Sequence, residues 1–171
     1  MRTREGRVGV KGVGVDIVDL GAFAASLAEP GTRFARVFSA TELRQSREAA
    51  ERRGRRGHGG LGGPGGHRGR PGSAPDTARH LAARWAAKEA VIKAWSGALY
   101  GAPPPIGRDE LDWAEISVVC DAWGRPGVRL TGRVAAEVAA GLGPVVWHLS
   151  LSHDGPSAIA YCVLEGRPEQ K

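Results

Sequence analysis

The sequence predicts an α+β fold in which a small, mostly antiparallel sheet packs on one long helix. Strand-like runs of Val, Ile and Leu lie near both ends of the chain, at residues 8–18, 145–152 and 158–164. Between them, residues 76–96 have the length and the N-terminal cap of a long helix. With 171 residues, the chain is expected to form a single domain over residues 1–171.

The first half of the chain begins with a buried strand. Residues 8–18 alternate Val or Ile with Gly, which is the pattern of such a strand. A short helix over residues 19–27 follows, with its first residue, an aspartate, at or near the N-cap. Ser39 and Glu42 have the spacing of a capping box, which predicts a second helix ending near Arg52.

The second half contains the long helix, a hairpin, a short helix and two further strands. Asp76 or Thr77 caps the long helix. The remaining elements, in chain order, are a strand at 116–121, a turn at 123–127, a strand at 128–131, a small-residue helix at 132–140, a strand at 145–152, a turn at 153–156 and a strand at 158–164.

Composition narrows the class of protein. Apolar residues make up 42% of the chain, which argues against extended disorder. No apolar run approaches the roughly 20 residues that span a bilayer, and the basic start lacks a signal-peptide apolar stretch, so we expect a cytoplasmic protein without a membrane partner. Cys120 and Cys162 lie in apolar strand-like runs, and we interpret both as buried, inert thiols in a reducing compartment.

Residues 52–75 stand apart as a segment dense in Gly, Arg and Pro. Its six arginines and lack of acidic residues account for the whole formal net charge of +6. We interpret it as a flexible insertion between two helices, because it cannot bury enough apolar area to order itself. Attraction of an acidic partner and binding of nucleic acid are the alternatives. No aromatic residue lies between Phe38 and Trp85 for base stacking, so nucleic acid is not expected as a partner.

The long helix carries charges where an ordinary helix has apolar residues. Side chains three or four positions apart share a helix face. Two adjacent rows result, one with Trp85, Glu89 and Lys93 and the other with Arg84, Lys88 and Ile92. The simple alternative is a surface helix with a Glu89–Lys93 salt bridge, worth a few tenths of a kcal/mol.

Asp16 is the second unusual acid, because it lies within an apolar strand. A carboxylate there needs a partner, water or a metal, although capping of the next helix is an alternative role. Asp16 and Glu89 together would suit Mg²⁺, which commonly takes one or two carboxylates with phosphates and waters. Arg84, Lys88 and Lys93 are then candidates for contacts with phosphate.

The end of the strand at 145–152 contains the run Ser150-Leu151-Ser152-His153-Asp154. A hydrolase triad is disfavoured, because adjacent strand residues point to opposite faces and the chain has no Gly-x-Ser-x-Gly motif. Two interpretations of His153 remain, a hydrogen-bonded turn histidine or part of a polar loop that contacts a phosphorylated ligand or its nucleophile. We expect His148, on the other face of this strand, to pack in the core or at the surface.

These motifs, in this order, resemble the AcpS-type holo-acyl-carrier-protein synthases of actinobacteria, which are 4′-phosphopantetheinyl transferases. The resemblance covers nearly the whole chain outside residues 52–75 and the two short tails. It rests on Val13-Gly14-Val15-Asp16-Ile17-Val18, Phe38-Ser39-x-x-Glu42-Leu43, the helix from Ala82 to Ala94, Gly124-Arg125-Pro126 and Leu149-Ser150-Leu151-Ser152-His153-Asp154.

The resemblance implies the 4′-phosphopantetheinyl transferase fold and a homotrimer with active sites between subunits. It implies Mg²⁺-dependent transfer of 4′-phosphopantetheine from coenzyme A to a serine of an apo-acyl carrier protein, which gives the holo-protein and adenosine 3′,5′-bisphosphate. The carrier protein could serve fatty-acid, polyketide or peptide synthesis. The alternatives from other classes are a nucleic-acid-binding Arg/Gly arm on a non-catalytic scaffold and a non-catalytic partner of carrier proteins.

The resemblance also implies roles for individual residues. Asp16 and Glu89 match metal ligands, and Lys93, Lys88 and Arg84 match residues near the coenzyme A phosphates. Gly124 and Pro126 match a hairpin turn near the adenosine, and Ser152 and His153 match the strand end that a neighbouring subunit contributes. The proton of the carrier serine would pass to Glu89 through a water molecule, or directly to Asp154.

The predicted first helix departs from the family pattern. It lacks the basic residues that many relatives present to the acidic carrier protein. The candidates to replace them are Arg33, Arg36, Arg44 and Arg47, or the arginines of residues 52–75.

Overall fold

The computed structural model describes residues 9–57 and 76–168 of the 171-residue chain. Its strands and α-helices are β1 (Gly9–Asp19), α1 (Leu20–Ala28), α2 (Ala40–Gly57), α3 (Asp76–Ala98), β2 (Ile116–Cys120), β3 (Pro126–Leu130), α4 (Gly132–Leu142), β4 (Val145–Asp154) and β5 (Ser157–Gly166). Three short 3₁₀ turns cover Phe34–Val37, Arg108–Glu110 and Trp113–Glu115. No helix in the described ranges has the length and hydropathy needed to cross a membrane.

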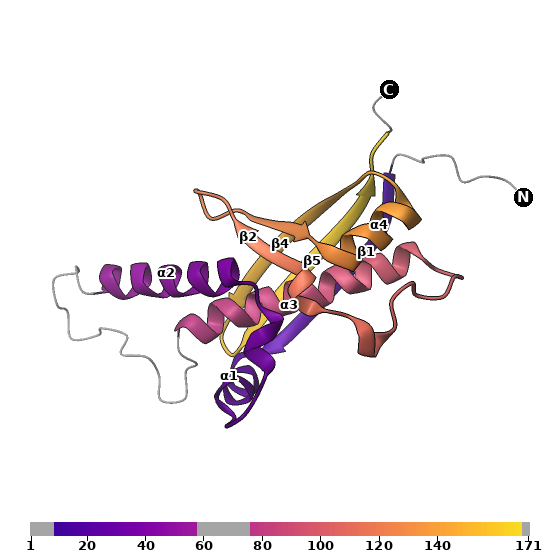
Figure 1. Ribbon diagram of the computed structural model, residues 1–171. Coiled ribbons are helices and arrows are strands. Elements are labelled where there is room, and N and C mark those ends of the chain that lie inside the picture. Colours follow the sequence, from indigo (N-terminus) through magenta and orange to yellow (C-terminus); the bar gives the residue numbers. More distant parts are fainter. Residues whose placement is uncertain (1–8, 58–75, 169–171) are drawn as a thin grey trace, which may run out of the picture.

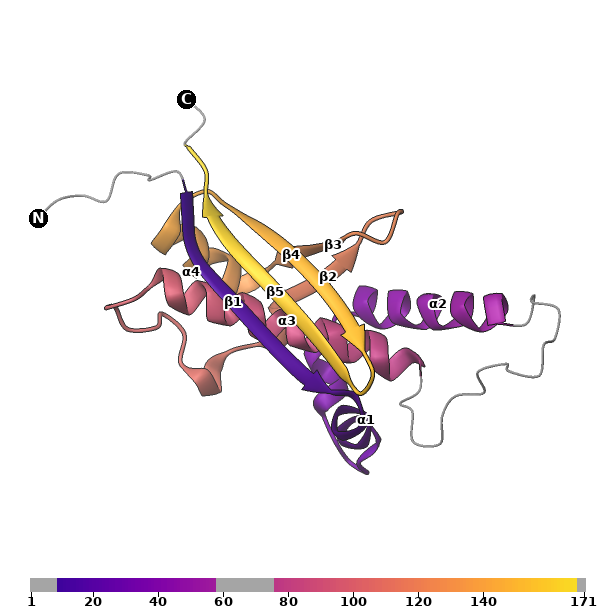
Figure 2. The same cartoon turned by 180° about the vertical axis from the view of Figure 1, so that it is seen from behind.

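The strands form two antiparallel sheets, which confirms the predicted α+β class. One sheet has three strands in the order β1-β5-β4, and the other is the β2-β3 hairpin. Helix α3 crosses one face of the three-stranded sheet, and the hairpin and α2 lie on the β4 side of this helix (Figures 1 and 2). Asp16 pairs with Ala160, and Ala160 pairs with Leu151, so Asp16 lies at the β1 edge of the sheet.

Glycines let β1 approach α3 closely. A Cβ atom at Gly12 would overlap the carbonyl oxygen of Ala94, and one at Gly14 would overlap that of Ala90. The Val/Gly alternation of this strand therefore places backbone, rather than side chains, against the helix. This contact presents the charged residues of α3 beside the β1 edge.

The core consists of two hydrophobic clusters that meet at Val18 and Leu151. The larger cluster packs the middle and end of α3 on both sheets and α4, and the smaller one packs α1 and the start of α3 with Phe23 and Phe38. Val18 and Leu151 contact both clusters, so the apolar interior is continuous.

A buried capping box ties α2 to the rest of the fold. The carboxylate of Glu42 accepts hydrogen bonds from the Ser39 backbone N–H (2.8 Å) and hydroxyl (2.9 Å), as the sequence predicts. It also accepts one from the backbone N–H of Val118 in β2 (3.0 Å) and pairs with Lys88 of α3 (3.1 Å). Glu42 and Lys88 have no exposed surface, so one carboxylate connects three elements.

The prediction of a loop over residues 52–75 is wrong for its first part. Helix α2 continues to Gly57, because arginine is a good helix former and Glu48 pairs with Arg44 (3.1 Å) and Arg52 (3.5 Å) one turn away on each side. Residues 58–75, and with them the remainder of the proposed insertion, lie outside the described residues. The strand β4 also runs two residues further than predicted, to Asp154.

The outer face of the three-stranded sheet is exposed, and its β1 and β5 part is apolar. No described helix covers it in Figure 2. Its exposed apolar residues are Val13, Val15, Ile17, Ile159 and Tyr161, with 40–65% of each accessible, whereas β4 contributes the polar residues His148, Ser150 and Ser152. Neighbours across the ladder, such as Val15 and Tyr161, form one continuous apolar surface, which we call the outer sheet face.

Candidate functional site

Asp16, Glu89 and Lys93 come together where β1 crosses α3. The ammonium of Lys93 donates to the Asp16 carboxylate (2.7 Å) and to the carbonyl of Val15 (3.0 Å). The alternative Glu89–Lys93 salt bridge is not among the ion pairs of the described residues, because Lys93 turns toward β1. Burial, and next the charge of Asp16, raise the pKa of Glu89, although Lys93 and Arg108 oppose this rise.

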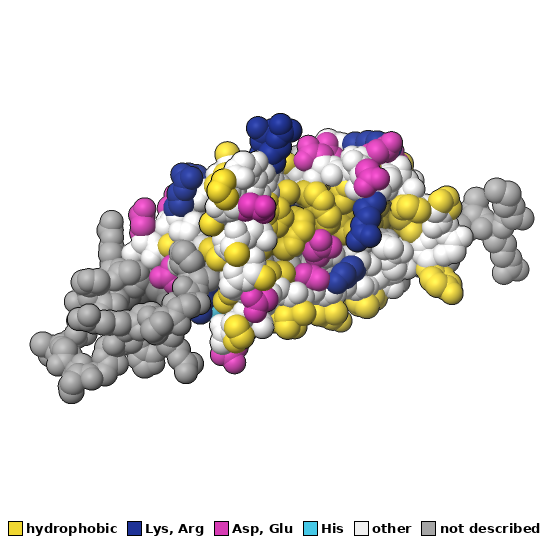
Figure 3. Space-filling model, turned by 90° about the horizontal axis from the view of Figure 1, so that it is seen from below, with side chains coloured by type: hydrophobic (Ala, Val, Ile, Leu, Met, Phe, Trp, Pro, Cys, Tyr) yellow, Lys and Arg dark blue, Asp and Glu magenta, His cyan; other side chains and the backbone are white. Residues whose placement is uncertain are grey.

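This arrangement fits a hard divalent cation. The described residues contain no group of three or more His, Cys, Asp or Glu side chains that could enclose a metal ion. The carboxylates that meet here are those of Asp16 and Glu89. Mg²⁺ commonly binds through one or two carboxylates and takes its other ligands from phosphates and water. A cation beside Asp16 and Glu89 would also relieve the repulsion that raises the pKa of Glu89. Figure 3 shows acidic side chains next to Lys or Arg side chains, amid hydrophobic surface.

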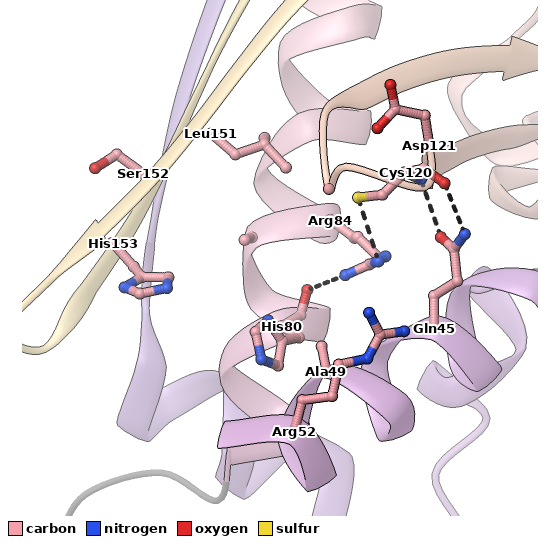
Figure 4. A pocket seen from close by; sticks show the side chains of 12 residues that line it. Gln45, Ala49, Arg52, His80, Arg84, Cys120, Asp121, Leu151, Ser152 and His153 are labelled. Atoms are coloured by element: carbon pink, nitrogen blue, oxygen red, sulfur yellow. Dashed lines mark hydrogen bonds between the residues drawn. The ribbon is translucent and has the colours of Figure 1, made fainter. Parts of the chain in front are cut away.

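A pocket of about 450 Å³ lies between α2, α3, the hairpin and β4. Basic side chains from separate elements border it, and the Cys120 thiol faces them (Figure 4). The residues that define its character are Arg52, His80, Arg84, Cys120, Gly124 and His153. No residue of β1 or β5 borders the pocket, so it lies at the opposite edge of the sheet from Asp16.

Arg84 is the buried cation of this pocket, with 5% of its surface exposed. One guanidinium N–H donates to the His80 carbonyl (3.2 Å) and another to the Cys120 sulfur (3.8 Å), and Nε has no hydrogen-bond partner among the described residues. Burial lowers the pKa of Arg84, although Cys120 and Glu42 oppose this. A buried guanidinium without a close carboxylate favours a bound anion, and phosphate suits its geometry.

The structure does not support the expected contact between Lys88 and a phosphate. Lys88 is fully buried, and its ammonium donates to Glu42 (3.1 Å), to the Trp113 carbonyl (3.0 Å) and to the Ile116 carbonyl. All three donors of the ammonium are therefore occupied by the protein. Burial lowers the pKa of Lys88, and Glu42 opposes the shift. The role of Lys88 here is to hold α2, α3 and β2 together.

Two of the three predicted residues at the end of β4 border the pocket. They are Ser152 and His153, although the Ser152 hydroxyl points to the opposite side of the strand from Leu151 (Figure 4). Asp154 is exposed and is not among the pocket residues. His148 pairs with Glu165 (2.8 Å) of the neighbouring strand, at the surface rather than in the core.

Hydrogen bonds and a glycine define the conformation of the hairpin turn. Gly124 has a positive φ of 84°, which favours glycine, and Pro126 begins β3. The Asp121 carboxylate accepts from the backbone N–H groups of Trp123 and Arg125 (2.9 Å each) and from the Arg125 side chain (2.6 Å). The backbone N–H of Arg125 is the main cause of the lowered pKa of Asp121.

Sequence reasoning missed several walls of the pocket. Arg52 was assigned to the flexible insertion, His80 was not singled out, and Cys120 was expected to be buried and inert. Cys120 is instead half-buried, whereas Cys162 is fully buried as expected. The one signal that could have placed Cys120 outside the core is that successive side chains of a strand such as β2 point to opposite faces.

The sequence matches a known protein family over most of its length. Residues 12–162 match the model of the 4′-phosphopantetheinyl transferase superfamily. A holo-[acyl-carrier-protein] synthase of Corynebacterium glutamicum strain R is 44% identical over 152 residues, which cover 89% of this chain and 96% of the relative. One of Mycobacterium tuberculosis strain H37Ra is 40% identical over 158 residues, covering 92% and 98%.

Solved structures agree with the sequence comparison. The ACPS–CoA complex of Chronobacterium ammoniagenes superposes with a TM-score of 0.73 at 40% identity, covering 91% of this chain and 97% of that one. The acyl carrier protein synthase of Mycobacterium tuberculosis gives a TM-score of 0.61 at 36% identity, covering 93% and 100%. The described fold and the sequence therefore point to the same family.

Proposed function

The chain belongs to the 4′-phosphopantetheinyl transferase superfamily, and on this premise we propose that it transfers 4′-phosphopantetheine from coenzyme A to a serine of apo-acyl carrier protein. The products are the holo-carrier protein and adenosine 3′,5′-bisphosphate. The observation that carries the proposal is the grouping of Asp16, Glu89 and Lys93 beside β1. Transfer of a phosphoryl-type group requires charge stabilisation more than covalent chemistry by the protein.

Each residue of this group has a proposed part in the reaction. Asp16 and Glu89 would hold Mg²⁺, whose charge offsets the negative charge on the departing phosphate. Lys93, held by Asp16 and the Val15 carbonyl, supplies a fixed positive charge there. Glu89 is the proposed acceptor of the serine proton through a water molecule, because a carboxylate beside the reacting phosphate would already be in position.

The Arg84 pocket is the proposed site for the 3′-phosphorylated adenosine end of coenzyme A. Its buried guanidinium has an unpartnered Nε, and His153 and the Gly124 turn border the same space. Asp16, Glu89 and Lys93 together are called the Asp16 group. This group and the pocket lie at opposite edges of one sheet. One coenzyme A molecule would therefore contact the Asp16 group of one subunit and the pocket of another.

A homotrimer would bring these two half-sites together. The outer sheet face supports this assembly, because apolar surface of this extent is unfavourable in water and suits a subunit interface. The alternative, a nucleic-acid arm, is weakened because four of the six arginines of residues 52–75 belong to helix α2 rather than to a loop, and the other two lie outside the described ranges.

Intact-mass spectrometry of apo-acyl carrier protein tests the activity directly. Incubation with the enzyme, coenzyme A and Mg²⁺ is expected to add the mass of phosphopantetheine, and EDTA is expected to abolish the gain. Asp16→Asn should lose activity, whereas Asp19→Asn is the matched control, because asparagine is an equally good N-cap. No mass gain with several carrier proteins would refute the proposed function.

The same assay tests Asp154 as the alternative base. Glu89→Gln should greatly reduce transfer, whereas Asp154→Asn should keep most of it, because Asp154 lies outside the pocket. The reverse result would assign the serine proton to Asp154.

A further inference from the structure

Cys120 has surroundings unlike those of the other cysteine in the chain. Cys162 is fully buried in the core, and burial raises its pKa to about 12. Cys120 is half-buried at the end of β2, and its side chain faces the pocket (Figure 4). We propose that Cys120 is a modification site that reacts with anionic low-molecular-weight disulfides, and that the resulting adduct blocks the pocket.

The Gln45 side chain anchors the backbone of Cys120. The backbone N–H of Cys120 donates to the Gln45 side-chain oxygen (3.0 Å), and its carbonyl accepts from the Gln45 side-chain nitrogen (2.9 Å). Figure 4 shows the sulfur joined by a hydrogen bond to the guanidinium of Arg84, on the pocket side of β2. The thiol therefore lies at the pocket wall.

The charges around the pocket favour an anionic reagent. Arg84 Nη2 lies 3.8 Å from the sulfur, and this residue is 95% buried with an Nε that has no partner among the described residues. His80 and His153 also border the pocket, and so does Arg52, which pairs with Glu48 (3.5 Å). The acidic pocket residue, Asp121, is already engaged by the turn and by Arg125.

The reaction is a thiol–disulfide exchange. The Cys120 sulfur attacks one sulfur of the disulfide, a new S–S bond forms to Cys120, and the original S–S bond breaks. The departing thiolate carries away the electron pair, and the proton of Cys120 passes to it or to the buffer. Cys120 is thereby oxidised and the small disulfide is reduced. A pocket of about 450 Å³ has room for a small organic adduct but not for that adduct together with a nucleotide.

The first test uses 5,5′-dithiobis(2-nitrobenzoate), a dianionic disulfide, on the full native chain. Intact mass is expected to show one adduct per chain, none in Cys120→Ser and two after unfolding of the wild type. Cys162→Ala is the matched control and should label as the wild type does. An unreactive native protein, or equal labelling of Cys162, would overturn the proposal.

The second test concerns the pocket itself. Adenosine 3′,5′-bisphosphate at about ten times its Kd should slow labelling about tenfold, and labelling without protection would refute blockage of the pocket. Only this blockage depends on the proposed function. Labelling is measured without any transfer reaction. A failure of Cys120 to react is therefore distinguishable from a failure of the transferase proposal. Transfer activity is also compared before and after treatment with the disulfide. Treatment should lower the activity of the wild type and leave that of Cys120→Ser at its own untreated level.

The third test concerns the choice of an anionic reagent. Arg84→Met should slow labelling by the dianionic disulfide about tenfold relative to labelling by neutral 4,4′-dithiodipyridine. If this variant does not fold, the wild-type rates of both reagents are compared with their rates on free glutathione. A wild-type preference for the neutral reagent would contradict the role of the basic groups.

Discussion

Replacing Lys88 with methionine would remove a buried cation while keeping nearly the same side-chain length. The ammonium of Lys88 pairs with Glu42 and also donates to two backbone carbonyls, those of Trp113 and Ile116. Both charged side chains have no exposed surface, so water cannot replace the lost contacts. Methionine fills much of the same space, which keeps the cavity term small.

The expected loss of stability follows from these contacts. Removal of one partner of a buried ion pair costs about 3–5 kcal/mol, because the other charge stays buried without compensation. Glu42 keeps three donors, the Ser39 N–H, the Ser39 hydroxyl and the Val118 N–H, which favours the lower part of that range. A loss of about 3 kcal/mol would lower the Tm by roughly 6–12 °C in a chain of this length.

A double-mutant cycle with Glu42→Gln measures the coupling directly. Urea unfolding followed by circular dichroism, at one fixed protein concentration, gives the free energy of unfolding for each variant. We expect the double variant to be more stable than the sum of the single losses predicts, by about 1–3 kcal/mol. Strict additivity, or a loss below about 1 kcal/mol for Lys88→Met, would refute the reasoning.

Three further outcomes follow from single sites. Gly14→Ala should lower the free energy of unfolding by about 1–3 kcal/mol, because a Cβ atom there overlaps an α3 carbonyl, whereas Gly141→Ala in open space should not destabilise. The Asp121 pKa lies below its ordinary value, chiefly through the Arg125 N–H, so Asp121 stabilises the fold above about pH 4. The difference in free energy of unfolding between wild type and Asp121→Asn, measured by urea unfolding, should therefore shrink as the pH falls further. A difference that stays constant with pH would contradict the stabilising role of Asp121. Tyr161→Glu, on the outer sheet face, should reduce the mass measured by light scattering, and an unchanged oligomer would contradict the proposed interface.

Local signals in the sequence predicted much of the fold. The Ser39–Glu42 capping box and the aspartate N-cap of α1 form as expected, because caps involve residues only three apart. Asp16 and Glu89 could be singled out because a carboxylate in an apolar strand or helix needs a partner. Local patterns could not show that α2 continues past Arg52, since composition suggested a loop while helix-forming arginines and ion pairs extend the helix.

The sequence by itself determined the α+β class, the order of the elements and the acids around which the Asp16 group forms, because periodicity and caps depend on near neighbours in the chain. Only the tertiary structure decided that Lys88 is internal, that Lys93 turns toward Asp16, and that Cys120 faces Arg84. Two positions on one helix can look equivalent in the sequence. Which of them meets solvent, a carboxylate or a pocket depends on elements distant in the chain that pack against that face.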